Sequence, residues 1–202
     1  MRRTVTRTNP GGQEERRRLL RHAPALAIAT LLSGWRRPAA AAGPAPRELA
    51  PQEPRPVPDF SFTDAAGTAH ALAGFEGKAF VINFWATWCA PCVAEMPALD
   101  RLQRAVSRDG IIVLALSSDR GGAAQVQPFY ERVGIRDLGV WLDPRGAAAR
   151  AFGVRAVPTT VIIDRRLRDV ARLAGPAEWD AEAMVSVVRR LAGPVPVPQA
   201  PA

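Results

Sequence analysis

Two cysteines separated by two residues are the side chains of this sequence with the clearest capacity for chemistry. Cys89 and Cys92 are the only cysteines in the 202-residue chain, and they lie within the stretch FWATWCAPCVAEMP. A pair with this spacing can exchange electrons with other thiols, contribute half of a metal site, or form a structural cross-link. The neighbouring residues discriminate between these three kinds of chemistry.

A metal site and a structural cross-link both fit the sequence poorly. A structural zinc ion takes four ligands, usually from cysteine and histidine, and the only histidines of the chain are His22 and His70. His22 moreover lies in a basic leader. A disulfide between Cys89 and Cys92 would close a very short loop, which constrains little conformational entropy in the unfolded chain. We therefore expect no resident metal and no cofactor.

The residues on either side of the pair favour redox chemistry. Residues 79–85, AFVINFW, are nearly all apolar, which is typical of a parallel strand buried on both faces. A core-facing helix is predicted after the pair by apolar residues at steps of three and four: Val93, Met96, Leu99, Leu102 and Val106. Cys89 should then stand at a helix N-terminus, which stabilises a thiolate, and Pro91 suits the first helical turn. This predicts an exposed, nucleophilic Cys89 and a shielded Cys92 that resolves the mixed disulfide.

Strands and helices alternate along the rest of the chain. Residues 59–72 show apolar residues at alternate positions around a glycine-containing turn, which predicts a β-hairpin. Further strands are predicted over residues 111–117, 140–143, 159–164 and 169–175, and further helices over residues 123–133, 147–152 and 179–191. This alternation indicates an α/β fold built on one sheet.

The positive charge of the chain is concentrated near its beginning. The formal net charge is +8, and nine arginines and two glutamates give residues 1–42 a charge of +7. The remaining residues therefore carry only +1. Because a charge so small gives no electrostatic attraction to polyanions, we expect no nucleic-acid partner.

Residues 1–42 have the pattern of an export signal or an anchor. A basic start precedes a weakly apolar run, Ala23–Gly34, which is shorter than the roughly 20 residues that span a bilayer. Small residues at Ala39–Ala42 suit signal cleavage. Arg16–Arg21 resembles the twin-arginine pattern, while a general secretory signal and an uncleaved anchor remain alternatives. Export would place the cysteine pair in the periplasm or another oxidising, extracytoplasmic compartment.

Proline-rich segments flank the predicted domain. Residues 43–58 read as a proline- and alanine-rich extended linker, and residues 193–202 as a disordered tail. Residues 59–192 between them are long enough for one domain with a buried core.

Four stretches of the sequence carry a family resemblance. Residues 88–92, WCAPC, resemble the active-site motif of the thioredoxin superfamily. Residues 77–99 resemble more closely the exported TlpA-like and ResA-like thiol–disulfide oxidoreductases. Residues 153–164, GVRAVPTTVIID, resemble the cis-proline loop and following strand of that family, and residues 173–180 the start of its last helix. The likeness extends over residues 59–191.

The resemblance implies a thioredoxin fold, in which a central mixed sheet is flanked by helices. It also implies an extra N-terminal β-hairpin and an inserted helix–strand segment around Gln125 to Val140. The Val157–Pro158 peptide bond would be cis and would lie beside the cysteines. The backbone of Val157 would then pair with an incoming peptide strand of a client protein.

Further site residues follow from the same resemblance. Trp88, Ala90, Pro91 and Thr159 are expected to join Val157 and Pro158 in a substrate-docking surface around a redox-active Cys89–Cys92 disulfide. Trp179, in contrast, is interpreted as a packing residue.

Glu95 is the expected proton-transfer residue. It lies three residues after Cys92, on the same helical face, and in the TlpA-like and ResA-like proteins a glutamate at this place influences the proton transfers of the cysteines. An ordinary solvated helix glutamate is the alternative. Thioredoxins proper carry a buried aspartate six residues before the first cysteine, where this sequence has Asn83. Because an amide takes no proton at neutral pH, we expect Glu95 or a water molecule to assist Cys92.

The resemblance and the predicted export together imply an extracytoplasmic protein-disulfide reductase. Its partners would be disulfide-containing clients, either apocytochrome c or copper-site assembly proteins of cytochrome oxidase, and a membrane thiol-reductant donor. Residues 175–180, GPAEWD, favour the TlpA-like branch and copper-site clients. Membrane contact would come only through an uncleaved leader.

Other functions stay open at this point. A dithiol oxidase of folding exported proteins would use the same cysteines, since the motif does not give the direction of electron flow. A copper-binding chaperone fits less well, because the Sco-like version of this fold needs a longer cysteine spacing and a late histidine. A non-catalytic docking module with a vestigial pair is the last alternative.

Overall fold

The computed structural model of the chain describes residues 49–195. The predicted export leader, residues 1–42, lies outside the described residues, as do residues 43–48 of the predicted linker and 196–202 of the predicted tail. Between residues 49 and 195, no helix is both long enough and apolar enough to cross a membrane.

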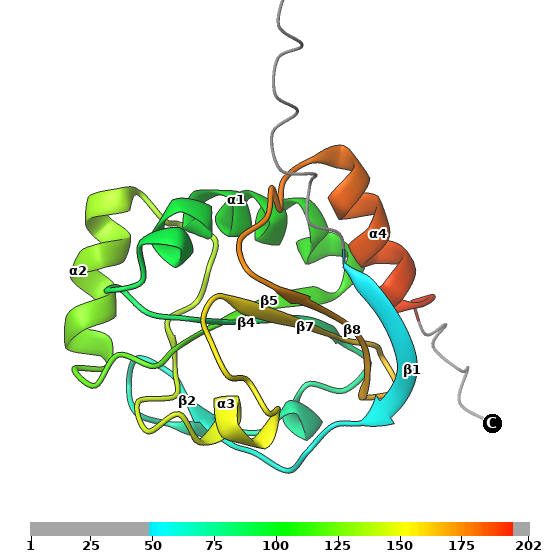
Figure 1. The fold of residues 1–202 in the computed structure, drawn as a ribbon, viewed down its shortest axis with the longest axis horizontal. Coiled ribbons are helices and arrows are strands. Elements are labelled where there is room, and N and C mark those ends of the chain that lie inside the picture. Colours follow the sequence, from blue (N-terminus) through cyan, green and yellow to red (C-terminus); the bar gives the residue numbers. More distant parts are fainter. Residues whose placement is uncertain (1–48, 196–202) are drawn as a thin grey trace, which may run out of the picture. The chain divides into compact units, whose positions relative to one another are not determined.

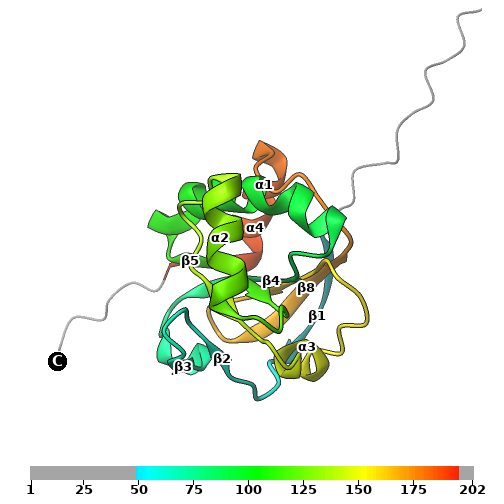
Figure 2. The same ribbon diagram turned by 90° about the vertical axis from the view of Figure 1, so that its left-hand side faces the viewer.

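The described residues form an eight-stranded mixed sheet with helices on both faces (Figures 1 and 2). Its strand order is β1-β8-β7-β4-β5-β6-β2-β3. The strands are β1 (Ala50–Pro56), β2 (Phe62–Thr63), β3 (Ala69–His70), β4 (Ala79–Trp85), β5 (Ile111–Ser117), β6 (Trp141–Leu142), β7 (Thr159–Ile163) and β8 (Arg168–Ala174). The helices are α1 (Ala90–Val106), α2 (Ala123–Val133), α3 (Ala147–Ala151) and α4 (Glu182–Ala192), with short 3-10 turns at Leu72–Gly74 and Ser107–Asp109.

The central strand β4 separates two hydrophobic layers. It runs parallel to β5 and antiparallel to β7. Val81 and Trp85 pack into the layer under α1, α2 and α4, whereas Phe80, Ile82 and Phe84 pack into the layer that contains α3. Because successive side chains of a strand point to opposite faces, a strand buried on both sides must be apolar almost throughout. The prediction of a doubly buried strand over residues 79–85 is therefore confirmed.

The predicted α/β class, the extra hairpin and the inserted segment are also confirmed. β2 and β3 pair antiparallel around a turn at Gly67, whose φ of 84° suits glycine. The inserted segment forms α2 and β6, and β6 pairs parallel to β5. β2 in turn pairs with β6, so the hairpin and the insertion together extend one edge of the sheet.

The prediction that residues 43–58 form a linker is wrong for Ala50–Pro56. These residues form strand β1, which pairs antiparallel with β8 at the other edge of the sheet. Prolines are compatible with this position, because an edge strand has one side that needs no ladder hydrogen bonds. A shift in register between Pro51 and Arg55 accommodates the proline-rich sequence.

Side chains fix β1 to the rest of the domain. Leu49, just before the strand, is only 5% exposed and belongs to the main hydrophobic core. The buried carboxylate of Asp169 on β8 accepts hydrogen bonds from Gln52 and from Arg172. The folded domain therefore includes the residues from Leu49 onward, whereas the sequence predicts its start at residue 59.

The last helix also differs from its prediction. α4 begins at Glu182, three residues after the predicted start at Trp179. Residues 175–181 instead form an irregular segment that brings Trp179 into the core, where it is fully buried. This segment is part of the site described below.

Substituting Leu49 tests whether the proline-rich segment belongs to the folded domain. Leu49→Ala should lower the free energy of unfolding by about 2–5 kcal/mol, because it removes buried methyl groups from the core. Glu53→Ala, at an exposed position of β1, is the control and should change the stability by less than about 0.5 kcal/mol. Urea denaturation measures both, and equal stability of the two variants would show that the segment is a linker.

Candidate functional site

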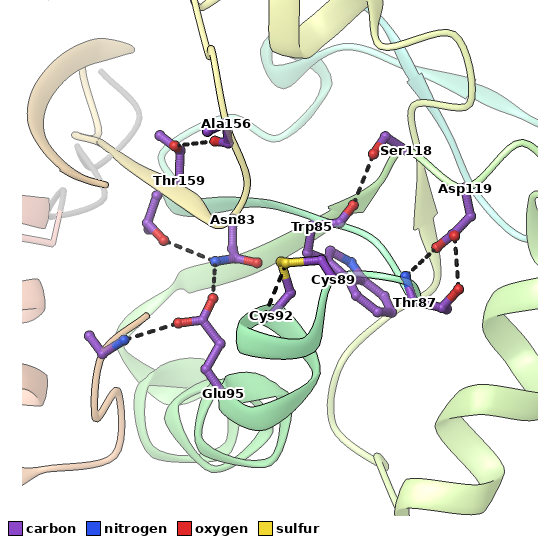
Figure 3. Close-up of a disulfide and its surroundings, with 12 residues drawn as sticks. Asn83, Trp85, Thr87, Cys89, Cys92, Glu95, Ser118, Asp119, Ala156 and Thr159 are labelled. Carbon is purple, nitrogen blue, oxygen red and sulfur yellow. Dashed lines mark hydrogen bonds between the residues drawn. A yellow bond between two sulfur atoms is a disulfide. The ribbon is translucent and has the colours of Figure 1, made fainter. Parts of the chain in front are cut away.

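The cysteine pair lies where β4 ends and α1 begins (Figure 3). Cys89 is the N-cap residue of α1, and its sulfur accepts a hydrogen bond of 3.3 Å from the backbone N–H of Cys92. Pro91 lies in the first turn, where a residue without an N–H leaves no acceptor unpaired. Cys89 and Cys92 are joined by a disulfide with an S–S distance of 2.07 Å. The structure thus shows the oxidised form of a pair at a helix N-terminus, which would stabilise a Cys89 thiolate after reduction.

Cys89 is less exposed than the sequence predicts. It is 6% exposed and Cys92 is fully buried. Cys89 is part of the main hydrophobic core cluster, which the sequence did not predict. The order of accessibility is nevertheless the expected one, with Cys89 as the outer sulfur.

Three of the expected docking residues are exposed around the pair. Trp88 is 70% exposed, and Ala90 and Pro91 also lie at the surface. An aromatic side chain with so much area in solvent is unusual for a packing residue, since its burial would be strongly favourable. Trp88 therefore presents an apolar face directly beside Cys89.

The Val157–Pro158 peptide bond is cis. Thr159 pairs with Phe84 near the end of β4, so Pro158 lies at the edge of the sheet from which Cys89 also emerges. The Thr159 hydroxyl donates a hydrogen bond of 2.6 Å to the carbonyl of Ala156. This side chain therefore stabilises the loop and is not free to bind a client. Within residues 49–195, no hydrogen bond engages the backbone N–H or carbonyl of Val157.

Glu95 lies inside the protein, one turn after Cys92. Its side chain is 3% exposed, which excludes the alternative of an ordinary solvated glutamate. The carboxylate accepts three hydrogen bonds: from the Asn83 amide at 3.0 Å, from the Ala177 N–H at 3.1 Å and from the Trp179 indole at 2.8 Å. The interpretation of Trp179 as a packing residue is confirmed, since it is fully buried, and its indole also binds Glu95.

The surroundings of Glu95 suit a group that exchanges protons. Burial raises the pKa of this carboxyl above the ordinary value of 4.5. The hydrogen bonds from Trp179, Asn83 and Ala177 oppose this effect, because they stabilise the ionised form, but burial is the larger influence. Glu95 also forms part of the wall of a shallow surface pocket between α1 and residues 177–181. Figure 3 shows the Glu95 carboxyl directed toward the Asn83 amide.

A second buried carboxylate supports the loop before Cys89. Asp119, directly after β5, is 1% exposed. It accepts hydrogen bonds of 2.8 Å from the backbone N–H and the hydroxyl of Thr87, and further ones from Ser117 and Gln125. Sequence reasoning missed this network, although its signal was present. Two neighbouring parallel strands end at the same side of the sheet, so a polar residue that follows one strand lies close to the residues that follow the other.

The described side chains offer no cluster of three or more histidine, cysteine, aspartate or glutamate residues that could hold a metal ion. The chemistry that the arrangement itself supports is thiol–disulfide exchange. The Cys89–Cys92 disulfide lies at a helix N-terminus, Glu95 is buried one turn after Cys92, and the backbone of Val157 has no hydrogen bond partner among the described residues.

This combination of fold and site defines a thioredoxin-like thiol–disulfide protein. Comparison with known proteins agrees: the chain belongs to the AhpC/TSA family, whose profile matches residues 54–169. It is 35% identical over 109 residues to the thiol-disulfide oxidoreductase ResA of Geobacillus thermodenitrificans, which confirms the ResA-like resemblance. That match spans 54% of this chain and 62% of the length of the relative, so it covers less than two thirds of the curated protein.

Solved structures confirm the thioredoxin-like fold. A candidate thiol:disulfide interchange protein DsbE from Chlorobium tepidum superposes with a TM-score of 0.62 at 26% identity, covering 71% of this chain and all of that chain. The exposed lipoprotein thioredoxin Etrx1 from Streptococcus pneumoniae superposes with a TM-score of 0.55 at 28% identity, covering 65% of this chain and 98% of that chain.

The raised pKa of Glu95 predicts a specific pH dependence of stability. Because the folded state holds this proton more tightly than the unfolded state, the free energy of unfolding should fall as the pH rises above about 4.5, the ordinary value. Glu95→Gln cannot ionise and should lack this decline, whatever its absolute stability. Urea denaturation at a series of pH values measures the difference between the two proteins.

Trp179→Phe provides the matched variant, because it keeps the carboxyl and removes one hydrogen bond donor. In this variant the free energy of unfolding, compared with that of Glu95→Gln, should continue to fall up to a higher pH. The reason is that the ionised Glu95 carboxylate has lost a stabilising hydrogen bond donor. Stability curves of wild type and Glu95→Gln that run parallel across this pH range would contradict the assignment.

Proposed function

We propose that this protein is an extracytoplasmic thiol–disulfide oxidoreductase that reduces disulfides in client proteins. The observation that carries the proposal is the position of the Cys89–Cys92 disulfide at the N-terminus of α1, beside the cis Val157–Pro158 bond. Cys89 is the more exposed of the two cysteines at 6%, Cys92 is fully buried, and the backbone N–H and carbonyl of Val157 have no hydrogen bond partner among the described residues. Cys89 is the nucleophile, Cys92 the resolving cysteine, and Glu95 the proton-transfer residue.

The reaction consists of two exchanges that together carry two electrons to the client. The Cys89 thiolate attacks a client disulfide, so that a bond forms between Cys89 and one client sulfur while the other client sulfur leaves and takes up a proton. Cys92 then loses its proton, for which Glu95 is the acceptor, and attacks the Cys89 sulfur. The Cys89–Cys92 disulfide re-forms, and the second client thiol is released. A donor dithiol must reduce the pair before the next cycle.

The docking surface follows from the same geometry. The free backbone N–H and carbonyl of Val157 would pair with an extended client segment on either side of its cysteine, as in strand addition to a sheet edge. Trp88, Ala90 and Pro91 supply an apolar contact on the opposite side of Cys89. Thr159 contributes indirectly, since its hydroxyl holds the Ala156 carbonyl and thereby the loop.

The compartment and the clients are inferred from the leader and the relatives. The Etrx1 structure is that of an exposed lipoprotein, and residues 1–42 have the pattern of an export signal or an anchor, so we place this protein in the periplasm or an equivalent compartment. Clients in assembly of cytochrome c or of the copper site of cytochrome oxidase, and a membrane thiol-reductant donor, are consistent with a ResA-like reductase. Residues 175–180, GPAEWD, favour copper-site clients through their likeness to the TlpA-like branch.

Trapping of mixed disulfides tests the proposed function. Cys92→Ser, expressed with its leader, should accumulate covalent adducts with client proteins on Cys89, because the second exchange cannot occur. The adducts should disappear on reduction with a small dithiol, and Cys89→Ser should form none. Identification of the trapped proteins names the clients.

Two outcomes would overturn the proposal. Absence of adducts on Cys92→Ser would show that the pair does not exchange with proteins, as expected of a docking module with a vestigial pair. Adducts confined to newly exported proteins that reach their disulfide-bonded form only when the wild-type protein is present would indicate a dithiol oxidase instead.

A further inference from the structure

Asn83 has one polar atom without a partner in the most buried part of the site. The residue is fully buried on β4. Its amide nitrogen donates both hydrogens, to Glu95 Oε1 and to Thr160 Oγ1, each at 3.0 Å. Its Oδ1 atom has no hydrogen bond partner among the described residues. A buried acceptor without a hydrogen bond donor destabilises the folded state, so its presence in a native protein needs a physical explanation.

The orientation of the Asn83 amide is determined by Glu95. An ionised carboxylate can only accept hydrogen bonds, so the amide nitrogen must face Glu95 Oε1. Exchanging the nitrogen and the oxygen would place two acceptors in contact. Oδ1 must therefore point away from Glu95, and Figure 3 shows it on the side of the cysteine pair.

The Asn83 side chain faces α1, the helix that carries Cys92. Cys92 and Glu95 lie one turn apart on α1, and both are buried. Asn83 lies on β4 between Val81 and Trp85, whose side chains belong to the core layer under α1. Because alternate residues of a strand share a face, the Asn83 side chain points toward the same helix.

The capacity of the pair to donate a hydrogen bond changes with its redox state. In the disulfide neither sulfur carries a hydrogen, so neither can donate. When a donor dithiol reduces the pair, two electrons break the S–S bond and the donor becomes a disulfide, releasing two protons. One proton binds to Cys92, and the other goes to solvent while Cys89 remains a thiolate. The Cys92 sulfur is fully buried, where a thiol needs an acceptor.

We propose that Asn83 Oδ1 accepts the hydrogen bond of the Cys92 thiol in the reduced protein. This inference rests on the proposed redox function. Asn83 is then a positioning residue: it holds Cys92 as a thiol while Cys89 carries the negative charge, and it keeps the inner sulfur in place for the second exchange. The substitution of asparagine for the aspartate of thioredoxins proper thus has a role of its own, as an acceptor that stays uncharged.

The inference has a direct energetic consequence. The unmet acceptor is present in the oxidised protein and satisfied in the reduced one, so Asn83 favours reduction of the pair. Removing Oδ1 should shift the thiol–disulfide equilibrium about tenfold toward the disulfide. Glu95 is the titratable group that contacts Asn83; the other members of the network, Thr160, Ala177 and Trp179, do not ionise near neutral pH.

Three proteins test the inference by equilibration with glutathione. Asn83→Leu has a similar volume and no acceptor, and it should favour the disulfide about tenfold more than wild type. Thr160→Val is the matched control, because it removes the other partner of the Asn83 amide and leaves Oδ1 in place. It should equilibrate within about twofold of wild type. Equal equilibrium constants for Asn83→Leu and wild type would overturn the inference.

Infrared spectroscopy of Cys89→Ser tests the same bond without altering Asn83. Cys92 is then the only thiol, and a hydrogen bond to Oδ1 should lower the frequency of its S–H stretching band. The shift should vanish in Cys89→Ser/Asn83→Leu and persist in Cys89→Ser/Thr160→Val. A band at the frequency of an unbonded thiol in Cys89→Ser itself would overturn the inference. Wild type that fails to exchange with glutathione at all would instead contradict the proposed function.

Discussion

The buried carboxylate of Glu95 is the interaction on which the site depends. A carboxylate can remain charged inside a protein only when hydrogen bond donors replace its lost hydration. Here the donors come from β4 and from the segment before α4, so the carboxylate joins three parts of the chain that are far apart in sequence. The same segment donates from Gly175 to the carbonyl of Pro158. The position of the cis-proline loop is therefore linked to the position of Glu95, the residue proposed to exchange protons with the cysteines.

Asp119 stabilises the loop on the other side of the cysteine pair. Its carboxylate holds both the backbone and the hydroxyl of Thr87, just before Trp88 and Cys89. The pair thus stands between two buried carboxylates, each fixed by strands of the central sheet. Reactive groups held by such rigid elements keep their geometry better than groups on free loops, which suits the proposed reaction, in which the two sulfurs react in sequence.

Much of this arrangement could be predicted from the sequence, because its signals are local. The strands over residues 79–85 and 111–117 were predicted with their observed bounds, since doubly buried parallel strands are continuous apolar runs. β1 could not be predicted, because its prolines resemble a linker and its pairing depends on the distant Asp169. The hydrogen bond of Trp179 to Glu95 joins residues 84 positions apart, and only the folded chain brings them together. The bond of Asp119 to Thr87 spans 32 positions, although the place of Asp119 after a buried strand was a signal that sequence reasoning missed.

The reduction potential of the wild-type Cys89–Cys92 pair tests most directly the claim that this protein is a reductant. It is obtained by equilibrating the protein with glutathione or dithiothreitol buffers and measuring the fraction of disulfide. A reductant of client disulfides should have a potential near the reducing end of the range for dithiol proteins, around −270 mV. A potential near −120 mV, at the oxidising end of that range, would contradict the account and indicate an oxidase.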